Sequence, residues 1–273
     1  MRKSLCFGFT LRLIAVVFGA LPAMADATIL LQENFTHPDG NFLSQIPNPG
    51  PGTAWFAHSG AGNKAIQVVD GAVTLEQSAG SGEDVSSDWG VAVGPGDTIF
   101  AGFDLTVTGS LSASSTYFAH FKSSGNTFNS RVWVTASQSS GDFTISLSGD
   151  SSITDTDGEA FWGSDLTYGT NYRVVHSYDF DSGEKSLWID PLNQMSASIT
   201  ATDSMVSNAM VQYAFRQSTG NTFQKIDNLT VATTFTEAHT GVPEPASLML
   251  WMLGWICCCF CTRRCGGTVM NPC

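Results

Sequence analysis

Residues 171–190 read NYRVVHSYDFDSGEKSLWID, and this stretch decides the fold. In its first half, large side chains alternate with polar ones, at Tyr172, Val174, His176, Tyr178 and Phe180. Successive side chains of a strand point to opposite faces, so this period of two predicts a strand with one buried face. The Asp-Ser-Gly that follows is typical of a tight turn, and residues 184–190 continue as a second strand. The stretch therefore predicts a β-hairpin.

The same alternation recurs along most of the chain. Further strands are expected at 28–35, 64–69, 72–77, 99–107, 116–122, 130–136, 143–148, 209–217 and 226–233. Charged residues make up only 13% of the sequence while Gly, Ser and Thr are frequent, which favours strands joined by turns over helices. Antiparallel strands with one buried face indicate an all-β fold, an antiparallel jelly-roll β-sandwich.

Charge and cysteine are distributed unevenly. Residues 26–245 contain all 24 acidic residues but only 7 of the 12 basic ones, a net charge of −17. Such a domain is repelled by nucleic acid, which we exclude as a partner, and by anionic lipid. Between Cys6 and Cys257 there is no cysteine, so the domain is expected to fold without disulfides or thiolate metal sites.

The first 25 residues have the pattern of a secretory signal peptide. Basic Arg2 and Lys3 precede an apolar stretch, and the small residues Ala23 and Ala25 form a cleavage site. Asp26 is then the expected first residue of the mature protein. This arrangement predicts export through the cell's export machinery.

The other end carries Pro243, Glu244 and Pro245, followed by the apolar run 248–261 and then by two arginines. In order and spacing this segment, 242–264, resembles the PEP-CTERM tail of exported bacterial proteins. The resemblance implies a hydrophobic helix in the inner membrane, recognition by an exosortase-like sorting enzyme, and final placement at the cell surface or in the extracellular matrix. The apolar run is short for a bilayer, which needs about 20 residues, as suits a transient anchor.

The hairpin carries a second resemblance. Its Tyr172, Val174, Tyr178 and Gly183, followed by Leu-Trp-Ile-Asp, are similar to the central hairpin of concanavalin-like and laminin-G-like jelly rolls. Such folds imply that the last strand returns beside the first, a role that residues 226–231 fit. The expected organisation is a signal peptide at 1–25, a jelly-roll domain at 26–233, a linker at 234–241, the sorting tail at 242–264 and a Cys-containing extension at 265–273.

Known catalytic motifs are missing from the sequence. No Glu is followed two residues later by Asp, so the paired carboxylates of laminarinase-type jelly-roll hydrolases are absent. Hydrolase, zinc-protease and phosphate-loop motifs are absent too. His176 lies on the apolar face of its strand and is expected to be a hydrogen-bonded core residue. We therefore expect no catalytic residues among these motifs, which favours a non-catalytic protein and leaves an enzyme as the alternative.

Two weaker signals point to binding. Asp155, Asp157 and Glu159 alternate in an acidic segment that can gather oxygens around a structural Ca²⁺, but the pattern favours a solvated turn, and no cofactor is otherwise expected. Trp162 and Trp188 are candidates for stacking on sugar rings, with core packing as the alternative for each.

The sequence favours a non-catalytic, surface-anchored or matrix-associated protein that binds extracellular polysaccharide or serves adhesion. Two alternatives remain open: a carbohydrate-active enzyme (glycoside hydrolase or lyase) with an unrecognised active site, and a purely structural surface component. Two carboxylates about 5–10 Å apart favour the enzyme, because glycosidases need that spacing. Exposed aromatic residues without such a pair favour binding.

If the Pro-Glu-Pro segment directs sorting, Glu244→Ala should leave unprocessed protein in the inner membrane. Cell fractionation followed by immunoblotting measures this. Identical fractionation of the variant and the wild type would show that the motif plays no part in sorting.

Overall fold

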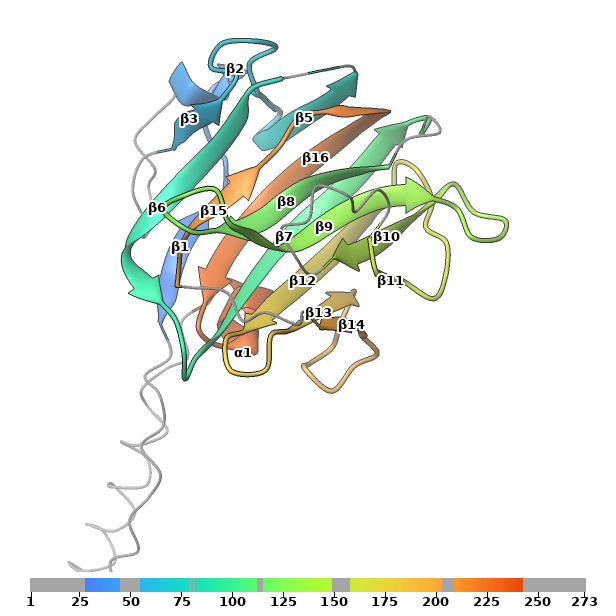
Figure 1. Ribbon diagram of the computed structural model, residues 1–273. Helices are drawn as coiled ribbons and strands as arrows, with labels where there is room; N and C mark the ends of the chain where they lie inside the picture. Colours follow the sequence, from blue (N-terminus) through green and yellow to red (C-terminus); the bar gives the residue numbers. More distant parts are fainter. Residues whose placement is uncertain are drawn as a thin grey trace, which may run out of the picture.

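The computed structural model describes residues 28–44, 55–78, 80, 82–111, 115–148, 158–202 and 209–242. Within these ranges the chain forms two antiparallel β-sheets stacked face to face, with one short helix on the outside (Figure 1). The sequence-based prediction of an all-β antiparallel β-sandwich is confirmed. The signal peptide, the sorting tail from residue 243 and the segment 265–273 lie outside the described residues. None of the described helices is long and apolar enough to cross a membrane.

The described strands divide into a nine-stranded and a seven-stranded sheet. The nine-stranded sheet has the order β14-β13-β12-β7-β16-β5-β4-β2, with β1 also paired to β16. Its strands are β1 (Ile29–Glu33), β2 (Gly40–Asn41), β4 (Gln67–Val69), β5 (Ala72–Ser78), β7 (Thr98–Gly109), β12 (Asn171–Asp179), β13 (Glu184–Ile189), β14 (Ile199–Thr202) and β16 (Thr219–Ala232). The 3₁₀ turn η1 (Phe42–Ser44) follows β2.

The seven-stranded sheet lies in front in Figure 1 and has the order β11-β10-β9-β8-β15-β6-β3. Its strands are β3 (Phe56–Ser59), β6 (Asp84–Val93), β8 (Thr116–Lys122), β9 (Phe128–Ala136), β10 (Phe143–Ser148), β11 (Ala160–Phe161) and β15 (Met210–Phe215).

Two specific topological predictions are confirmed. The hairpin of residues 171–190 is β12 and β13, paired from Val174 with Ile189 to Tyr178 with Lys185. The last strand returns beside the first, since β16 pairs with β1 and brings Val231 opposite Leu31.

The core lies between the sheets. Its largest fully buried side chains include Phe103, Phe118, Phe121, Tyr178 and Tyr213. These residues come from β7, β8, β12 and β15, so both sheets contribute large rings to one interior layer. Aromatic residues of this size contribute much of the apolar area that a core buries.

His176 is buried in this core and joins the two sheets. Its Nδ1 lies 2.9 Å from the Ser130 hydroxyl and its Nε2 lies 2.8 Å from the Tyr213 hydroxyl. Burial lowers the pKa of His176 to about 3, so the ring stays neutral in neutral solution. The prediction of a hydrogen-bonded core histidine is confirmed.

Residues 234–241, expected to be a linker, instead form the capped helix α1 (Phe235–Thr240), so that prediction is wrong. The Thr234 hydroxyl accepts a hydrogen bond from the Glu237 backbone N–H at 3.3 Å, and Gly241 ends the helix with a φ of 67°. The domain therefore continues beyond residue 233.

Helix α1 packs on the outer face of the nine-stranded sheet. Phe235 is 4% exposed and sits against the rings of Phe100 and Trp188. Gly102 in β7 lets the helix come this close, because a Cβ there would lie 2.1 Å from the Ala238 carbonyl oxygen. The residues around Phe235 and Trp188 thus form a second, smaller apolar cluster between helix α1 and the outer face of the nine-stranded sheet.

Phe235→Ala should lower the free energy of unfolding by about 3 kcal/mol, because it removes a buried ring from this cluster. Thr236→Ala, on the exposed side of the same helix, is the matched control and should change stability by less than about 0.5 kcal/mol. Chemical denaturation of both variants measures the difference. Two variants with wild-type stability would restore the linker interpretation.

Candidate functional site

The outer face of the seven-stranded sheet carries an unusual set of side chains. In β9, Val132 and Val134 point into the core, so Arg131 and Trp133 point outward. In β15, Tyr213 and Phe215 point inward, and Gln212 therefore lies outside. In β8, Phe118, Ala119 and Phe121 belong to the core, and bulges shift the alternation, so that Tyr117, His120 and Lys122 lie outside.

Strand register lines up aromatic rings across this face. Phe161 pairs with Ser146, Ser146 pairs with Trp133, and Trp133 pairs with Tyr117. Directly paired residues on adjacent strands have side chains on the same side. A row of three rings therefore crosses β11, β10, β9 and β8, with Ser146 between the first two.

Basic side chains surround the end of this row. Two guanidinium groups lie near the Tyr117 ring, with Arg216 Cζ 4.3 Å and Arg131 Cζ 5.2 Å from its centroid. Lys122 follows His120 on the outer side of β8, and its Nζ donates to Gln212 Oε1 at 2.9 Å. We call the outer surface around Lys122, Arg131 and Arg216 the cationic face.

Two neutral histidines belong to the cationic face. His120 is 1% exposed, and neither of its ring nitrogens has a hydrogen-bond partner in the described structure. Burial, together with the charges of His58, Arg131, Arg216 and Lys122, lowers its pKa well below the usual value.

The second histidine, His58 of β3, is half-buried, and its Nδ1 lies 2.6 Å from the Ser86 hydroxyl. Burial and the Lys122 charge lower the pKa of His58 to about 4. Both rings are therefore neutral hydrogen-bonding groups near pH 7.

Two carboxylates flank the cationic face on β6. Asp84 accepts a hydrogen bond from the Gln217 N–H at 2.9 Å, and Asp88 lies 3.4 Å from Gln212 Nε2. Four residues along a strand span about 13 Å, beyond the separation that either glycosidase mechanism uses. The acid and base of a hydrolase are therefore not provided by this pair.

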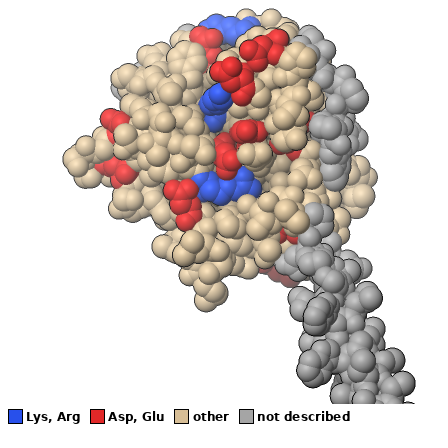
Figure 2. Space-filling model, turned by 180° about the vertical axis from the view of Figure 1, so that it is seen from behind, with Lys and Arg blue, Asp and Glu red and all other residues tan. Residues whose placement is uncertain are grey.

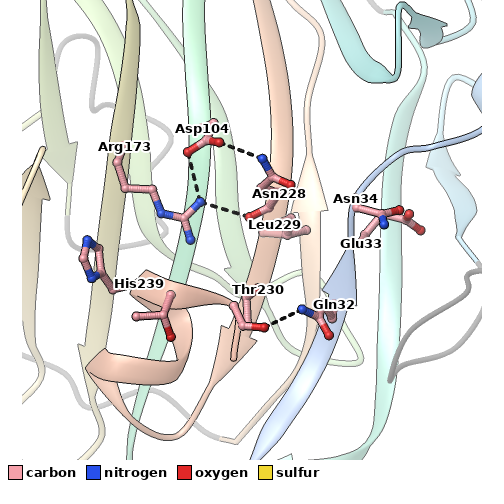
Figure 3. A pocket seen from close by; sticks show the side chains of 11 residues that line it. Gln32, Glu33, Asn34, Asp104, Arg173, Asn228, Leu229, Thr230 and His239 are labelled. Carbon is pink, nitrogen blue, oxygen red and sulfur yellow. Dashed lines mark hydrogen bonds and ion pairs between the residues drawn. The ribbon is translucent and has the colours of Figure 1, made fainter. Parts of the chain in front are cut away.

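A second candidate lies on the opposite side of the molecule. A polar pocket of about 330 Å³ opens between β1, β7, β12, β16 and α1, and Figure 3 shows Arg173 in it, directed toward Asp104 and Asn228. The guanidinium group donates to Asp104 Oδ1 at 3.2 Å, to the Asn228 carbonyl at 3.0 Å and to the Ala238 carbonyl at 2.6 Å. Arg173 is thus used to hold α1 against the sheet.

The face around this pocket is mixed in charge. Figure 2 shows acidic and basic side chains beside one another along that side of the molecule. The Asp104 carboxylate is bonded both to Arg173 and to Asn228 Nδ2, at 2.8 Å for the latter. Arg173 and Asp104 therefore satisfy each other's charge within the fold.

Trp162, the first sugar-contact candidate from the sequence, follows the edge strand β11. Its backbone N–H donates to the Ile145 carbonyl at 2.8 Å, and its half-buried ring packs against the core. The preceding residue, Phe161, lies on the outer face because it pairs with Ser146, and it is 37% exposed. The sequence placed the candidate one residue away from the ring that faces outward.

Trp188 lies on the outer face of its sheet but is only 5% exposed. Helix α1 covers it, and its Nε1 donates to the Gln194 carbonyl at 3.2 Å. Trp188 therefore belongs to the smaller apolar cluster, which is the core-packing alternative given for it from the sequence. Trp188 offers no free face to a sugar.

The calcium prediction falls mostly outside the described residues. Asp155 and Asp157 are not described, whereas Glu159 is exposed and its backbone N–H donates to the Leu147 carbonyl at 2.9 Å. The described residues alone contain no group of three or more potential metal ligands. The calcium site remains a prediction.

Sequence reasoning did not identify the cationic face. Strands 116–122 and 130–136 were expected, and their outward positions hold Tyr117, His120, Lys122, Arg131 and Trp133. Aromatic and basic residues at the polar positions of two neighbouring strands were the available signal. Their convergence with Arg216 depends on strand order, which the sequence pattern does not specify.

No protein-family model matches the chain, and no curated protein sequence matches it. Among solved structures, the carbohydrate recognition domain of Emp47p is similar with a TM-score of 0.46 and 7% identity, over 79% of this chain and 99% of that one. A sialidase is similar with a TM-score of 0.48 and 14% identity, over 76% of this chain. This chain spans only 19% of that sialidase.

The alginate lyase A1-II' is similar with a TM-score of 0.43 and 13% identity, over 61% of this chain and 82% of that chain. Likenesses this distant do not bear on what the present chain binds. The closer resemblance to concanavalin-like jelly rolls that the hairpin suggested stays a prediction.

Burial raises the pKa of Asp84 from 3.8 to about 6, so the ionised carboxylate destabilises the folded state at neutral pH. That cost disappears as the pH falls through 6 and the carboxyl group takes up a proton. Asp84→Asn keeps an acceptor for the Gln217 N–H, and should raise the free energy of unfolding by ~1–3 kcal/mol at pH 7 and by nearly nothing at pH 4. Urea titrations at both pH values test this, and an equal effect at both would contradict it.

Proposed function

We propose that this chain is an exported, non-catalytic carbohydrate-binding protein, and that the cationic face is its binding surface. The row of Phe161, Trp133 and Tyr117 across one sheet face is the observation that carries the proposal. Sugar rings have flat apolar faces that pack well on aromatic rings aligned in this way. Phe161 and the half-buried Tyr117 are the accessible rings of the row, and Trp133 supports them from beneath.

Hydrogen-bonding groups lie beside the rings, as a polyhydroxylated ligand requires. The Trp133 Nε1 is already bonded to the Ser148 hydroxyl at 2.8 Å, which fixes the ring. His120 lies between Tyr117 and Phe128, with ring centroids 5.5 Å and 4.7 Å away. His120 is 1% exposed and packs against both rings, so the half-buried His58 is the histidine that a sugar hydroxyl group can reach.

The non-catalytic part of the proposal has two supports. The sequence contains no recognised catalytic motif, and the two carboxylates beside the face are too far apart for glycoside hydrolysis. Export and sorting, expected from residues 1–25 and 242–264, would place the face among extracellular polysaccharides. Attachment to the cell surface or the matrix is the location that this function needs.

Tyr117→Ala should weaken polysaccharide binding about ten-fold, because it removes the accessible ring at the cationic end of the row. Phe223→Ala is the matched control: Phe223 is a 39% exposed ring in β16 of the other sheet. Affinity electrophoresis of the full chain in gels containing a panel of polysaccharides measures both variants.

Equal retention of both variants would exclude the aromatic row as the binding surface. A thermal melt of each variant shows whether the fold is intact. Release of reducing or unsaturated sugars by the wild-type chain would establish the enzyme alternative instead.

A further inference from the structure

We infer that the ligand of the cationic face is an acidic polysaccharide, whose carboxylate or sulfate groups pair with Arg216 and Lys122. This inference rests on the proposed function and adds the chemical class of the ligand to it. Residues 26–245 contain 24 acidic and 7 basic side chains, and three of those seven basic side chains converge on the cationic face. This concentration of positive charge in an otherwise acidic domain gives the cationic face a local attraction for anionic groups.

Arg216 and Lys122 have a ring or hydrogen-bonding groups as direct partners, and the charges of Asp84 and Asp88 act on them from further away. Elsewhere in the described residues, ion pairs join His37 with Glu33, Arg173 with Asp104 and Lys225 with Asp70. Arg216 contacts the Tyr117 ring instead, and the Lys122 ammonium group bonds to the Gln212 side chain and the Ser123 carbonyl. Neither has a carboxylate within ion-pair distance in the described part of the chain.

Arg173, on the other sheet, is a basic residue with a structural role and can be compared with Arg216. Its guanidinium group has a carboxylate and two backbone carbonyls as partners, so its charge is satisfied without a ligand. Arg216 and Arg131 instead flank one ring, at 4.3 Å and 5.2 Å from its centroid. The two positive groups gathered at this ring repel each other, and a bound anion relieves that repulsion.

A neutral histidine extends the site. The half-buried His58 can donate a ring N–H to an oxygen of the ligand while adding no further positive charge. Planar guanidinium groups match the two oxygens of a carboxylate, which gives directional contacts along the polymer. The half-buried setting of Arg216 strengthens such a pair relative to one in open water.

The remainder of the domain argues for a narrow polymer. Its net charge of −17 repels a broad anionic surface such as a membrane or duplex nucleic acid, which would meet the acidic sides as well. A single polysaccharide chain can follow the row of rings and contact little else. Acidic glycans are therefore favoured over other polyanions.

Isothermal titration of the full-length chain with two matched pairs of polymers tests the inference. Polygalacturonate is compared with its methyl ester, which keeps the backbone and removes the charge, and dextran sulfate is compared with dextran. The charged member of at least one pair should bind at least ten-fold more tightly than its neutral partner, and this preference should weaken as the salt concentration rises. The pair that shows the preference tells carboxylate from sulfate.

Variants locate the charge contact. Arg216→Gln should reduce the affinity for the preferred polyanion about ten-fold, and Arg216→Lys should recover part of it. Lys225→Gln removes a basic side chain from the opposite sheet and should change affinity less than two-fold. Unchanged melting temperatures confirm that the variants are folded, and Lys122→Gln repeats the test at a second position.

Equal affinity for charged and neutral members would overturn the inference while leaving the proposed function standing. Binding to neutral glycans alone would do the same. If the chain bound none of these polymers and none of a wider panel of neutral glycans, the proposed function itself would fail.

Discussion

The two-residue period of strands β8, β9 and β15 is the constraint on which the rest of the structure depends. Every second side chain must fill the space between the sheets, and Phe121, Val132 and Tyr213 do so. The residues between them are then obliged to face away from the core, where no other sheet covers them. The cationic face is the set of side chains that this geometry leaves outside, so the packing of the core and the chemistry of the surface follow from the same alternation.

The two outer faces of the sandwich are put to different uses. On the nine-stranded sheet, helix α1 covers the apolar cluster of Phe235 and Trp188, and Arg173 fastens the helix to the strands below it. Charges there have partners within the fold. On the seven-stranded sheet, Arg216 lies against the Tyr117 ring and Lys122 bonds to the Gln212 side chain, and neither is bonded directly to a carboxylate of the described residues. That difference is the reason for proposing the seven-stranded sheet as the one that binds a ligand.

Much of the fold was predictable because alternation is a local signal, as in the hairpin of residues 171–190. Strand β6 was missed, since its sequence from Asp84 to Val93 mixes small polar residues with a glycine. Helix α1 was missed although Thr234, Glu237 and Gly241 form a capping box and a C-terminal glycine cap, because six residues are too few to show helical periodicity.

The site was less predictable for a different reason. Choosing Trp162 over Phe161 was an error of one residue, and one residue reverses the face of a strand. Arg216 approaches Tyr117 from nearly one hundred positions along the chain only because β15 pairs with β8. Such long-range strand order has no signature in a local pattern.

The central claim is that the cationic face binds an acidic glycan. A crystal structure of the protein with an oligogalacturonate bound tests it most directly. The account predicts sugar rings packed on Tyr117 and Phe161, with a ligand carboxylate within ion-pair distance of Arg216. An oligosaccharide seated instead in the pocket beside α1, in contact with Arg173, would contradict it.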